Sequence, residues 1–367
     1  MKAALLGCLL VLTACGPFPE KARDTAPDPS AREEVSHTLA RQFHLDERAD
    51  GSWITVFGPD GATDTLCHYR LVRVPGSNEE VGVPVQRIAL LTTTAAPFLE
   101  ALGVADRIIA SVYPDRLRGE VLHRHVRSGA VAALSPAPGG AREQLIDLRP
   151  DIIFDAPYGH AIPGPRNGAV TMPVTEYLEQ DPLGRADWLR FFAALTGTED
   201  KGEQLMAGIR ERYERTCRSR ATDSLRPTVF FGSCWQGRWS APAGDSYMAR
   251  LIADAGGSYL HADEGHGGNL DLSVEQVLAD AARADLWGMI VDVPGLERIA
   301  QLPGIDERLV GSNALRPGRV FVANTATADL FGLAQLEPDL LLADLVALFD
   351  PAGHADHHGT YFRMLSQ

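Results

Sequence analysis

Two runs of alternating strand and helix patterns, separated by one long helical stretch, constrain the fold of this 367-residue chain most strongly. In the stretch after Gly197, apolar residues recur at helical spacing, at Leu205, Met206, Ile209, Tyr213 and Cys217. A helix of about 22 residues is about 33 Å long at the usual rise per residue. That is long for a crossover within one small domain, so the stretch predicts a helix that connects two domains.

The first run begins after Pro84. Strand candidates VQRIALL, DRIIASV, DIIFDA and AVTMPVTEY alternate with helical stretches such as APFLEALG, which Gly103 is expected to end. The second run starts with the strand candidate PTVFFGS and the helix SYMARLIADAGG, and closes with the strand RVFVAN and the helix PDLLLADLVALF. Strands that alternate with helices at this spacing predict parallel sheets covered by helices, so the fold class is α/β.

Residues 38–84 follow a different pattern. The strand candidates SWITVFG and CHYRLVRV flank the turn PDGA, in which Pro presets φ and Gly supplies a positive φ. We expect these strands to add a hairpin to the edge of a larger sheet.

The N-terminus has the pattern of an export signal. A positively charged start precedes a short apolar run, residues 3–12, which is too short to span a bilayer as a helix. Leu12-Thr13-Ala14-Cys15 resembles a bacterial lipobox, in which cleavage falls before the cysteine and its sulfur is lipidated. The alternative is an ordinary secretory signal cleaved near Ala14. A similar pattern at Cys8 has no apolar run before it.

Composition narrows the class of protein. Hydrophobic residues make up 45% and charged residues 22% of the chain, as in soluble globular proteins. The formal charge of −14 argues against general nucleic-acid binding, which depends on clustered Lys and Arg. Cys67, Cys217 and Cys234 match no metal-binding spacing and form at most one disulfide.

Several segments resemble a known family. They are PVQRIALLTTTAAPFLEALGVADRIIAS, EQLIDLRPDIIF, EYLEQDPLGRADWLRFFAALTG, SYMARLIADAGGSYL and LSVEQVLADAARADLWGMIVD. In this order, and with the lipobox-like start, they resemble the solute-binding lipoproteins of ABC importers for iron-siderophores, haem and cobalamin. The resemblance spans about residues 84–346. It implies two Rossmann-like lobes joined by a single long helix, with a ligand cleft between the lobes and only small lobe movements.

The resulting organisation has five parts. They are a lipoprotein signal peptide (1–14), a Pro-rich flexible tether (15–35), an N-terminal lobe (36–182) that includes the hairpin region, a connecting helical segment (183–221) and a C-terminal lobe (222–367). The expected location is the cell envelope of a bacterium, with the protein lipid-anchored to a membrane and facing the periplasm or the exterior.

Aromatic residues gather in the loops that we expect at the carboxyl ends of the strands, where open α/β sheets bind ligands. These residues are Tyr113, Tyr158, Tyr177, Trp235 and Trp239. Their rings would stack on a flat ligand such as a catecholate, porphyrin or corrin. The alternative interpretation is that these aromatics only cap the lobes.

Two arginines are candidates for binding anionic groups of the ligand. Arg116 begins a run of arginines and histidines that ends at Arg127, and Arg185 lies in PLGRADW. Guanidinium groups pair bidentately with catecholate oxygens or haem propionates. Alternatively, the run is a solvated helix face and Arg185 fixes its own helix.

Two further hypotheses concern iron. His266, or Tyr158 together with His160, would be axial ligands of a bound haem. A dedicated metal-ion site needs three or four convergent His and carboxylate ligands, and no such spacing occurs in the sequence. The tail GHADHHG is typical of adventitious metal binding. We therefore expect no metal site and no resident cofactor.

The resemblance also implies permease docking through one acidic residue on each lobe. Glu275, in LSVEQVL, occupies the matching place in the second lobe, where it would also favour the helix dipole. The first lobe departs from the family pattern, because the corresponding segment is the basic run. Its candidate carboxylate is Glu120.

The sequence has none of the motifs GxSxG, P-loop, HExxH or dinucleotide fingerprint. A lipid-anchored extracytoplasmic hydrolase is the alternative, and an adhesive lipoprotein fits two βα runs poorly. We expect a non-enzymatic binding protein that captures a metal chelate and delivers it to an ABC permease. The expected chelate is a ferric siderophore first, and cobalamin or haem next.

Overall fold

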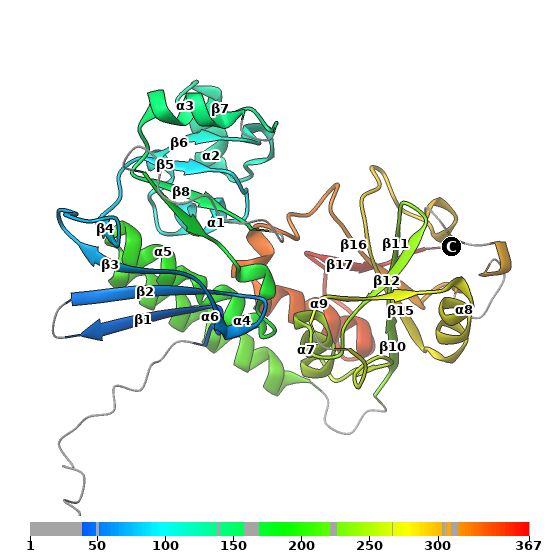
Figure 1. Cartoon of the computed structure of the whole chain (residues 1–367). Coiled ribbons are helices and arrows are strands. Elements are labelled where there is room, and N and C mark those ends of the chain that lie inside the picture. Colours follow the sequence, from blue (N-terminus) through cyan, green and yellow to red (C-terminus); the bar gives the residue numbers. More distant parts are fainter. Residues whose placement is uncertain are drawn as a thin grey trace, which may run out of the picture. The chain divides into compact units, whose positions relative to one another are not determined.

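The structure is a computed structural model of the chain that describes residues 39–366, except 49–50, 138–139, 158–168, 221–225, 266, 303–304, 306 and 310–314. It contains two five-stranded α/β sheets, one from each half of the sequence, and two smaller sheets. The first half is coloured blue to green and the second half yellow to red in Figure 1. Within the described ranges, no helix is long and apolar enough to cross a membrane.

The first half contains a fully parallel sheet with the strand order β7-β6-β5-β8-β9. Its elements in chain order are β5 (Ile88–Leu90), α1 (Ala96–Ala101), β6 (Ile108–Ser111), α2 (Glu120–Arg127), β7 (Ala132–Ala133), α3 (Ala141–Leu148), β8 (Ile152–Asp155) and β9 (Val170–Pro173). Gly103 follows α1 with φ 79°, a left-handed conformation that glycine adopts without steric cost. The predicted βα alternation is thus confirmed for this half.

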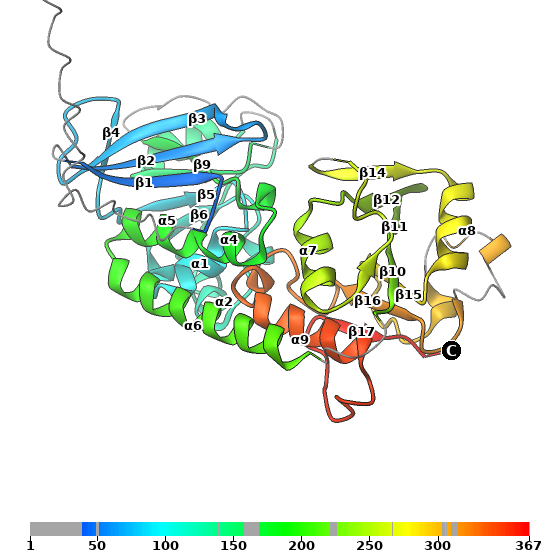
Figure 2. The same cartoon turned by 90° about the horizontal axis from the view of Figure 1, so that it is seen from below.

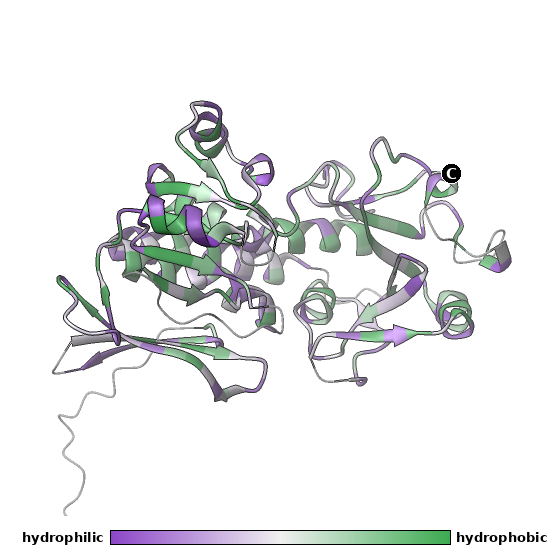
Figure 3. Ribbon diagram, turned by 45° about the horizontal axis from the view of Figure 1, so that its top comes forward, coloured by the Kyte–Doolittle hydropathy of each residue, from purple (hydrophilic) through white to green (hydrophobic). Residues whose placement is uncertain are grey.

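The region before residue 84 forms a sheet of its own, so the expected edge hairpin is wrong. Strands β1 (Phe43–Arg48), β2 (Gly51–Gly58), β3 (Gly61–Val72) and β4 (Glu80–Gly82) pair in sequence order, apart from the parallel sheet. This sheet packs face-on instead, because its inner residues Phe43, Ile54 and Val56 belong to the core of the first half. Figure 3 shows alternating hydropathy along these strands.

Buried carboxylates hold the first described residues. Glu179 accepts hydrogen bonds from the backbone N–H groups of Arg41 (3.0 Å) and Gln42 (2.9 Å). Asp187 accepts one from the N–H of Leu39 at 2.5 Å. Burial raises the pKa of both carboxyls. The first described residues are therefore bonded to buried carboxylates of the first half.

Three helices lead from the first half to the second: α4 (Pro182–Ala186), α5 (Trp188–Thr196) and α6 (Glu199–Ser219). Gly197 ends α5 with φ 68°, and α6 is 21 residues long, so the predicted long helix is confirmed. Its residues Met206 and Ile209 are buried in the core of the first half, whereas Tyr213 is buried in a core of the second half. One rigid helix thus contributes to both cores.

The second half contains the sheet β13-β10-β15-β16-β17, in which β17 alone runs antiparallel to its neighbour. The elements are β10 (Thr228–Phe231), α7 (Tyr247–Asp254), β13 (Ser258–Tyr259), α8 (Val274–Arg283), β15 (Leu286–Val291), β16 (Val320–Asn324), α9 (Pro338–Phe349) and β17 (Phe362–Met364). A small antiparallel sheet combines β11 (Ser233–Trp235), β12 (Arg238–Pro242) and β14 (Asn269–Leu272). Figure 2 shows α4 of the first half beside α7 of the second, and these two helices are in contact.

Candidate functional site

Loops that follow three strands of the first half meet at the carboxyl edge of its sheet, where ligands bind in open α/β folds. Thr92–Thr94 follows β5, Tyr113 follows β6, and Glu176 follows β9. The hydroxyl oxygens of Thr92 and Thr94 lie 3.1 Å apart. This edge therefore carries hydroxyl groups, a phenol and a buried carboxyl group.

Tyr113 and Arg116, both predicted from the sequence, lie together. Tyr113 is 40% exposed, and the Arg116 guanidinium carbon lies 5.1 Å from the centroid of its ring. Pro114–Arg116 forms a 3₁₀ turn, which brings the two side chains to one side. Both remain accessible, so an aromatic face and a cation are presented side by side.

Glu176 is a residue that the sequence reasoning missed. It is 1% exposed, and burial raises the pKa of its carboxyl to about 7, although a hydrogen bond from Thr94 and the charge of Arg185 lower it. Its Oε2 atom has no hydrogen-bond partner among the described residues. An acidic residue three positions after an apolar strand was the available signal. A buried carboxyl group with a raised pKa therefore lies at this edge of the sheet, as at many functional sites.

Arg185 and Tyr177 are brought together, but Arg185 is already engaged. Its Nη2 donates to the Tyr177 carbonyl at 2.9 Å, and its Cζ lies 4.2 Å from the ring centroid of Tyr247 on α7. Burial raises the pKa of the Tyr247 phenol. Arg185 therefore joins the two halves, which is closer to the alternative of a structural role than to a free anion-binding group.

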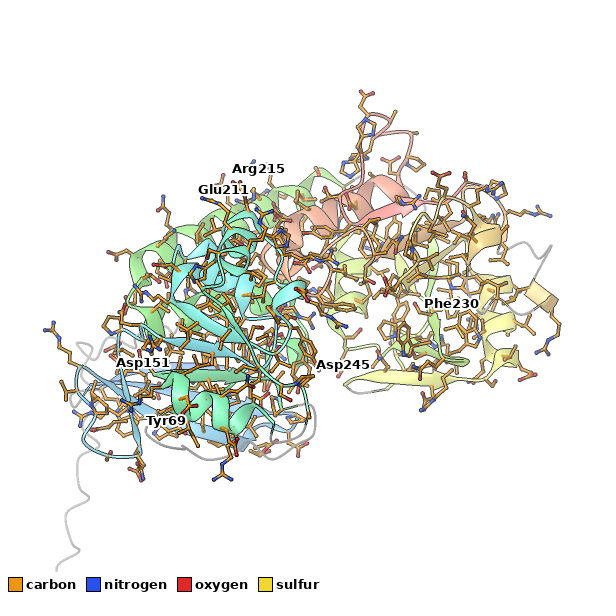
Figure 4. All side chains as sticks on the ribbon, turned by 90° about the horizontal axis from the view of Figure 1, so that it is seen from above. Tyr69, Asp151, Glu211, Arg215, Phe230 and Asp245 are labelled. Carbon is orange, nitrogen blue, oxygen red and sulfur yellow. The ribbon has the colours of Figure 1, made fainter. Side chains whose placement is uncertain are left out.

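A second contact between the halves lies nearby. The Gln180 side-chain amide donates to Asp245 Oδ2 at 2.9 Å, and the Gly267 N–H donates to Asp245 Oδ1 at 2.8 Å. Figure 4 labels Asp245. Gln180 belongs to the first half and Asp245 to the second. The Asp245 carboxylate therefore links the two halves and also holds the loop that contains Gly267.

The second half has a cavity of about 370 Å³ at the carboxyl ends of β10 and β15. It is lined by Ser233, Cys234, Trp235, Gln236, Trp239 and Met289–Val293. An aromatic rim, a thioether and the carboxylate of Asp292 meet there. A mostly apolar cavity with a few polar groups is typical of small-molecule sites.

The loop that we expected around Trp235 is instead a β-hairpin. Trp235 pairs with Arg238, and the two residues between them have positive φ, 51° for Gln236 and 80° for Gly237. A two-residue turn of this kind matches the twist of antiparallel strands. The hairpin presents Trp235 with 67% of its surface exposed.

Trp239 does not offer an open stacking face, contrary to expectation. It is 4% exposed, and its ring centroid lies 5.7 Å from that of Trp287 in a core cluster of the second half. Trp239 faces inward on β12 because side chains alternate along a strand. It closes the inner wall of the cavity, whereas Trp235 stands at the rim.

The two docking candidates are both accessible. Glu120 is in the first turn of α2, with its side chain 89% exposed, and it pairs with Arg124 at 3.6 Å. Glu275 is in the first turn of α8, with its side chain 74% exposed, and it pairs with Arg308 at 3.3 Å. Such exposed pairs contribute little to stability.

Several predicted residues lie outside the described residues: Cys15, Tyr158, His160 and His266. Within the described part, no three His, Cys, Asp or Glu side chains are grouped so that they could hold a metal ion. Cys67, Cys217 and Cys234 are free thiols.

A further cavity, of about 470 Å³, is lined from both halves, by residues that include Arg41, Gln180, Asp181, Arg226, Asp245 and Arg250. Its charges are mixed, and it includes none of the residues that the sequence predicted.

Two α/β halves, one helix shared by their cores and a cavity at the carboxyl ends of the strands define a two-lobed substrate-binding protein. The chain belongs to the periplasmic binding protein family, whose model matches residues 88–327. This family consists of substrate-binding transport proteins and not of enzymes. The resemblance inferred from the sequence is confirmed, and the alternative of a hydrolase is wrong.

Known structures with the same fold include a periplasmic heme binding protein of Pseudomonas aeruginosa (TM-score 0.56, 18% identity, 77% of this chain and 99% of that chain). Another is Ceue of Helicobacter pylori with Ni(II) bound (0.56, 12%, 76% and 88%). A third is the triscatecholate siderophore binding protein FeuA of Bacillus subtilis with ferri-bacillibactin (0.53, 13%, 73% and 94%). At these identities the similarity establishes the fold.

A relative in sequence is an uncharacterized lipoprotein of Methanocaldococcus jannaschii, 23% identical over 283 residues. The match covers 74% of this chain and 66% of that lipoprotein, so the chain spans slightly less than two thirds of its relative's length.

Proposed function

We propose that this protein captures a metal chelate outside the cytoplasm and delivers it to an ABC permease while a lipid on Cys15 tethers it to the membrane. A ferric siderophore is the first candidate ligand, and cobalamin or haem comes next. The proposal is supported by the family, by the neighbours solved with heme-binding or siderophore-binding functions, and by the lipoprotein relative.

The single observation that carries the proposal is the exposed Trp235 ring at the rim of the cavity in the second half. A large aromatic side chain that is two-thirds exposed beside a cavity offers apolar area that a ring-bearing ligand can remove from water. Tyr113 with Arg116 supplies a second aromatic surface with a cation in the first half. A flat, partly anionic chelate matches both features.

Binding of purified protein to haemin, cyanocobalamin and ferric complexes of catecholate and hydroxamate siderophores tests the proposal, with Trp quenching and visible absorbance as readouts. We expect one of these chelates to bind, and Trp235→Ala to weaken its binding about tenfold, as loss of a stacked aromatic does. Trp53→Phe is the matched control, because Trp53 lies on β2 and stacks on His68. Failure of every chelate to bind wild type would overturn the proposal.

A further inference from the structure

The segment between β16 and α9, residues 325–336, exposes two apolar side chains. Phe331 is 61% exposed and Leu333 is 44% exposed. Their neighbours Leu330 and Leu336 are both 6% exposed. Gly332 and residues 334–336 are buried as well, whereas residues 325–329 are partly or fully exposed. Phe331 and Leu333 are therefore the two exposed positions of the otherwise buried stretch 330–336.

The start of this segment is bonded to the wall of the cavity in the second half. The backbone N–H of Thr325 donates to the Val291 carbonyl at 2.8 Å, and its hydroxyl donates to the same oxygen at 3.2 Å. The Asn324 side chain also bonds both the N–H (3.1 Å) and the carbonyl (2.7 Å) of Val293. Val291 and Val293 line the cavity, so the segment begins beside it.

The other end of the segment belongs to the first half. Leu330 packs in a core of the second half, whereas Leu336 packs in the core of the first. The 3₁₀ helix η7 (Leu333–Leu336) contacts α1 and α4, and α1 directly follows the Thr92–Thr94 loop. Arg118, after β6, donates to the Thr325 carbonyl at 3.3 Å. The segment thus runs from the core of the second half to that of the first, and Phe331 and Leu333 lie between its buried residues Leu330 and Leu336.

Hydrogen bonds hold the turn that carries Phe331. Asp329 Oδ2 accepts from the N–H of Leu333 at 2.9 Å, and the amide of Gln335, itself 5% exposed, donates to the Phe331 carbonyl at 2.6 Å. A Cβ at Gly332 would collide with Asp329 Oδ2, so a larger residue there would displace the carboxylate that accepts from Leu333. Phe331 is consequently presented by an ordered backbone.

We infer that Phe331, with Leu333 beside it, forms an apolar contact surface for the ring system of the bound chelate, at the junction of the two halves. The inference rests on the proposed function and specifies its ligand class as a ring-bearing chelate: a catecholate, a porphyrin or a corrin. Trp235 then contacts the ligand from the second half, Tyr113 from the first, and Phe331 from the segment that connects them.

The ligand is favoured over a protein partner as occupant because the segment is continuous with the cavity wall. Val291 is both a lining residue and the acceptor for Thr325. Ligands of open α/β sheets bind outside the carboxyl ends of the strands, and Asn324 is the carboxyl end of β16. Burial of the exposed Phe331 ring against an apolar ring removes both surfaces from water.

The test compares Phe331→Ala, Phe331→Trp and a control, Ile146→Ala, in the full-length protein. Ile146 is an apolar residue of similar exposure, 42%, on α3. The probes are haemin, cyanocobalamin and ferric tris-catecholate, with ferric desferrioxamine B as a chelate without rings. We expect Phe331→Ala to bind the ring-bearing probe of the wild type about tenfold more weakly. Phe331→Trp should stay within about threefold and gain fluorescence quenching, and Ile146→Ala should match the wild type.

Each other outcome is decisive. Equal affinity of Phe331→Ala and wild type for a ring-bearing probe overturns the inference and leaves the proposed function intact. Preference of the wild type for ferric desferrioxamine B alone overturns the ligand class. Unchanged binding together with slower uptake by cells that express Phe331→Ala makes the segment a permease contact instead. No binding of any probe to the wild type overturns the proposed function, and the inference with it.

Discussion

The guanidinium carbon of Arg185 lies 4.2 Å from the centroid of the Tyr247 ring, which joins the first half of the molecule to helix α7 of the second. The same side chain donates to the Tyr177 carbonyl, and its charge opposes the larger rise that burial causes in the pKa of Glu176. Arg185 thus interacts with the Tyr177 backbone and the Glu176 carboxyl group of the first half and with the Tyr247 ring of the second.

Arg185→Ala should lower the free energy of unfolding by about 1–2 kcal/mol, because a partly desolvated cation–π contact and a hydrogen bond are lost. Urea denaturation at pH 8 measures the effect. Arg215→Ala is the control, since Arg215 pairs with Glu211 on the exposed face of α6 at 2.7 Å (Figure 4) and should change stability by less than about 0.5 kcal/mol. Equal effects of the two substitutions would contradict the role of Arg185.

Glu176→Gln should remove a pH dependence of stability. The carboxyl pKa is raised from 4.5 to about 7, so the folded protein holds this proton more tightly than the unfolded chain does. The resulting stability is full below pH 4.5 and is lost as the pH rises through 7. We expect the wild type to lose up to about 3 kcal/mol from this group between these limits.

Urea denaturation at several pH values from 5 to 8 is the measurement for Glu176→Gln. The variant should be more stable than the wild type at pH 8 and should show a flatter profile. Glu143→Gln, at an exposed position of α3, should reproduce the wild-type profile. A Glu176→Gln profile parallel to that of the wild type would show that this carboxyl does not titrate between pH 5 and 8.

Trp239→Ala should destabilise the fold by about 3–5 kcal/mol, because it removes a buried ring from the core around Trp287. Trp235→Ala should change stability by less than about 1 kcal/mol, because its ring is mostly exposed. Thermal and urea unfolding of both variants checks the contrast. A loss of less than about 1 kcal/mol for Trp239→Ala would contradict the role of this ring in the core.

Glu275→Arg should leave chelate binding unchanged and slow uptake severalfold, more strongly in combination with Glu120→Arg. Exposed charges at the rim of an interface act mainly on the association rate and its salt dependence. Uptake of the identified chelate by cells that express each variant is the measurement, with Glu211→Arg on α6 as the control. Wild-type uptake by the double variant would remove the docking proposal.

Cys15→Ala should leave the protein uncleaved or release it from the membrane, because the lipid on the Cys15 sulfur is the proposed anchor. Several acyl chains together give the stable attachment that would be lost. Fractionation of cells and the mass of the processed protein measure this. Cys8→Ala is the matched control and should be processed and retained like the wild type. Normal processing and membrane retention of Cys15→Ala would contradict the lipoprotein assignment.

The sequence by itself determined the order of the elements, because local signals specify them. Helical spacing from Leu205 to Cys217 predicted α6, and Gly197 marked its start. Apolar runs predicted β5, β6, β8 and β9 of the first sheet and β10 and β16 of the second, but not the short strands β7, β13 and β17. The sequence also singled out Tyr113 and Arg116, which a short 3₁₀ turn brings together in the structure.

Tertiary structure decided what depends on contacts between distant residues. Nothing in the sequence pattern distinguished Trp235 from Trp239. In the structure, alternation along β12 and packing on Trp287 bury Trp239, whereas Trp235 on β11 stays exposed. Whether the β1–β4 strands extend the edge of the parallel sheet or pack on the core depended on a distant contact. Phe43 packs against Trp188, 145 positions away in the chain, with ring centroids 5.1 Å apart. Glu176 and Phe331 gained their significance in the same way, because burial and exposure are properties of the packed molecule and not of a local pattern.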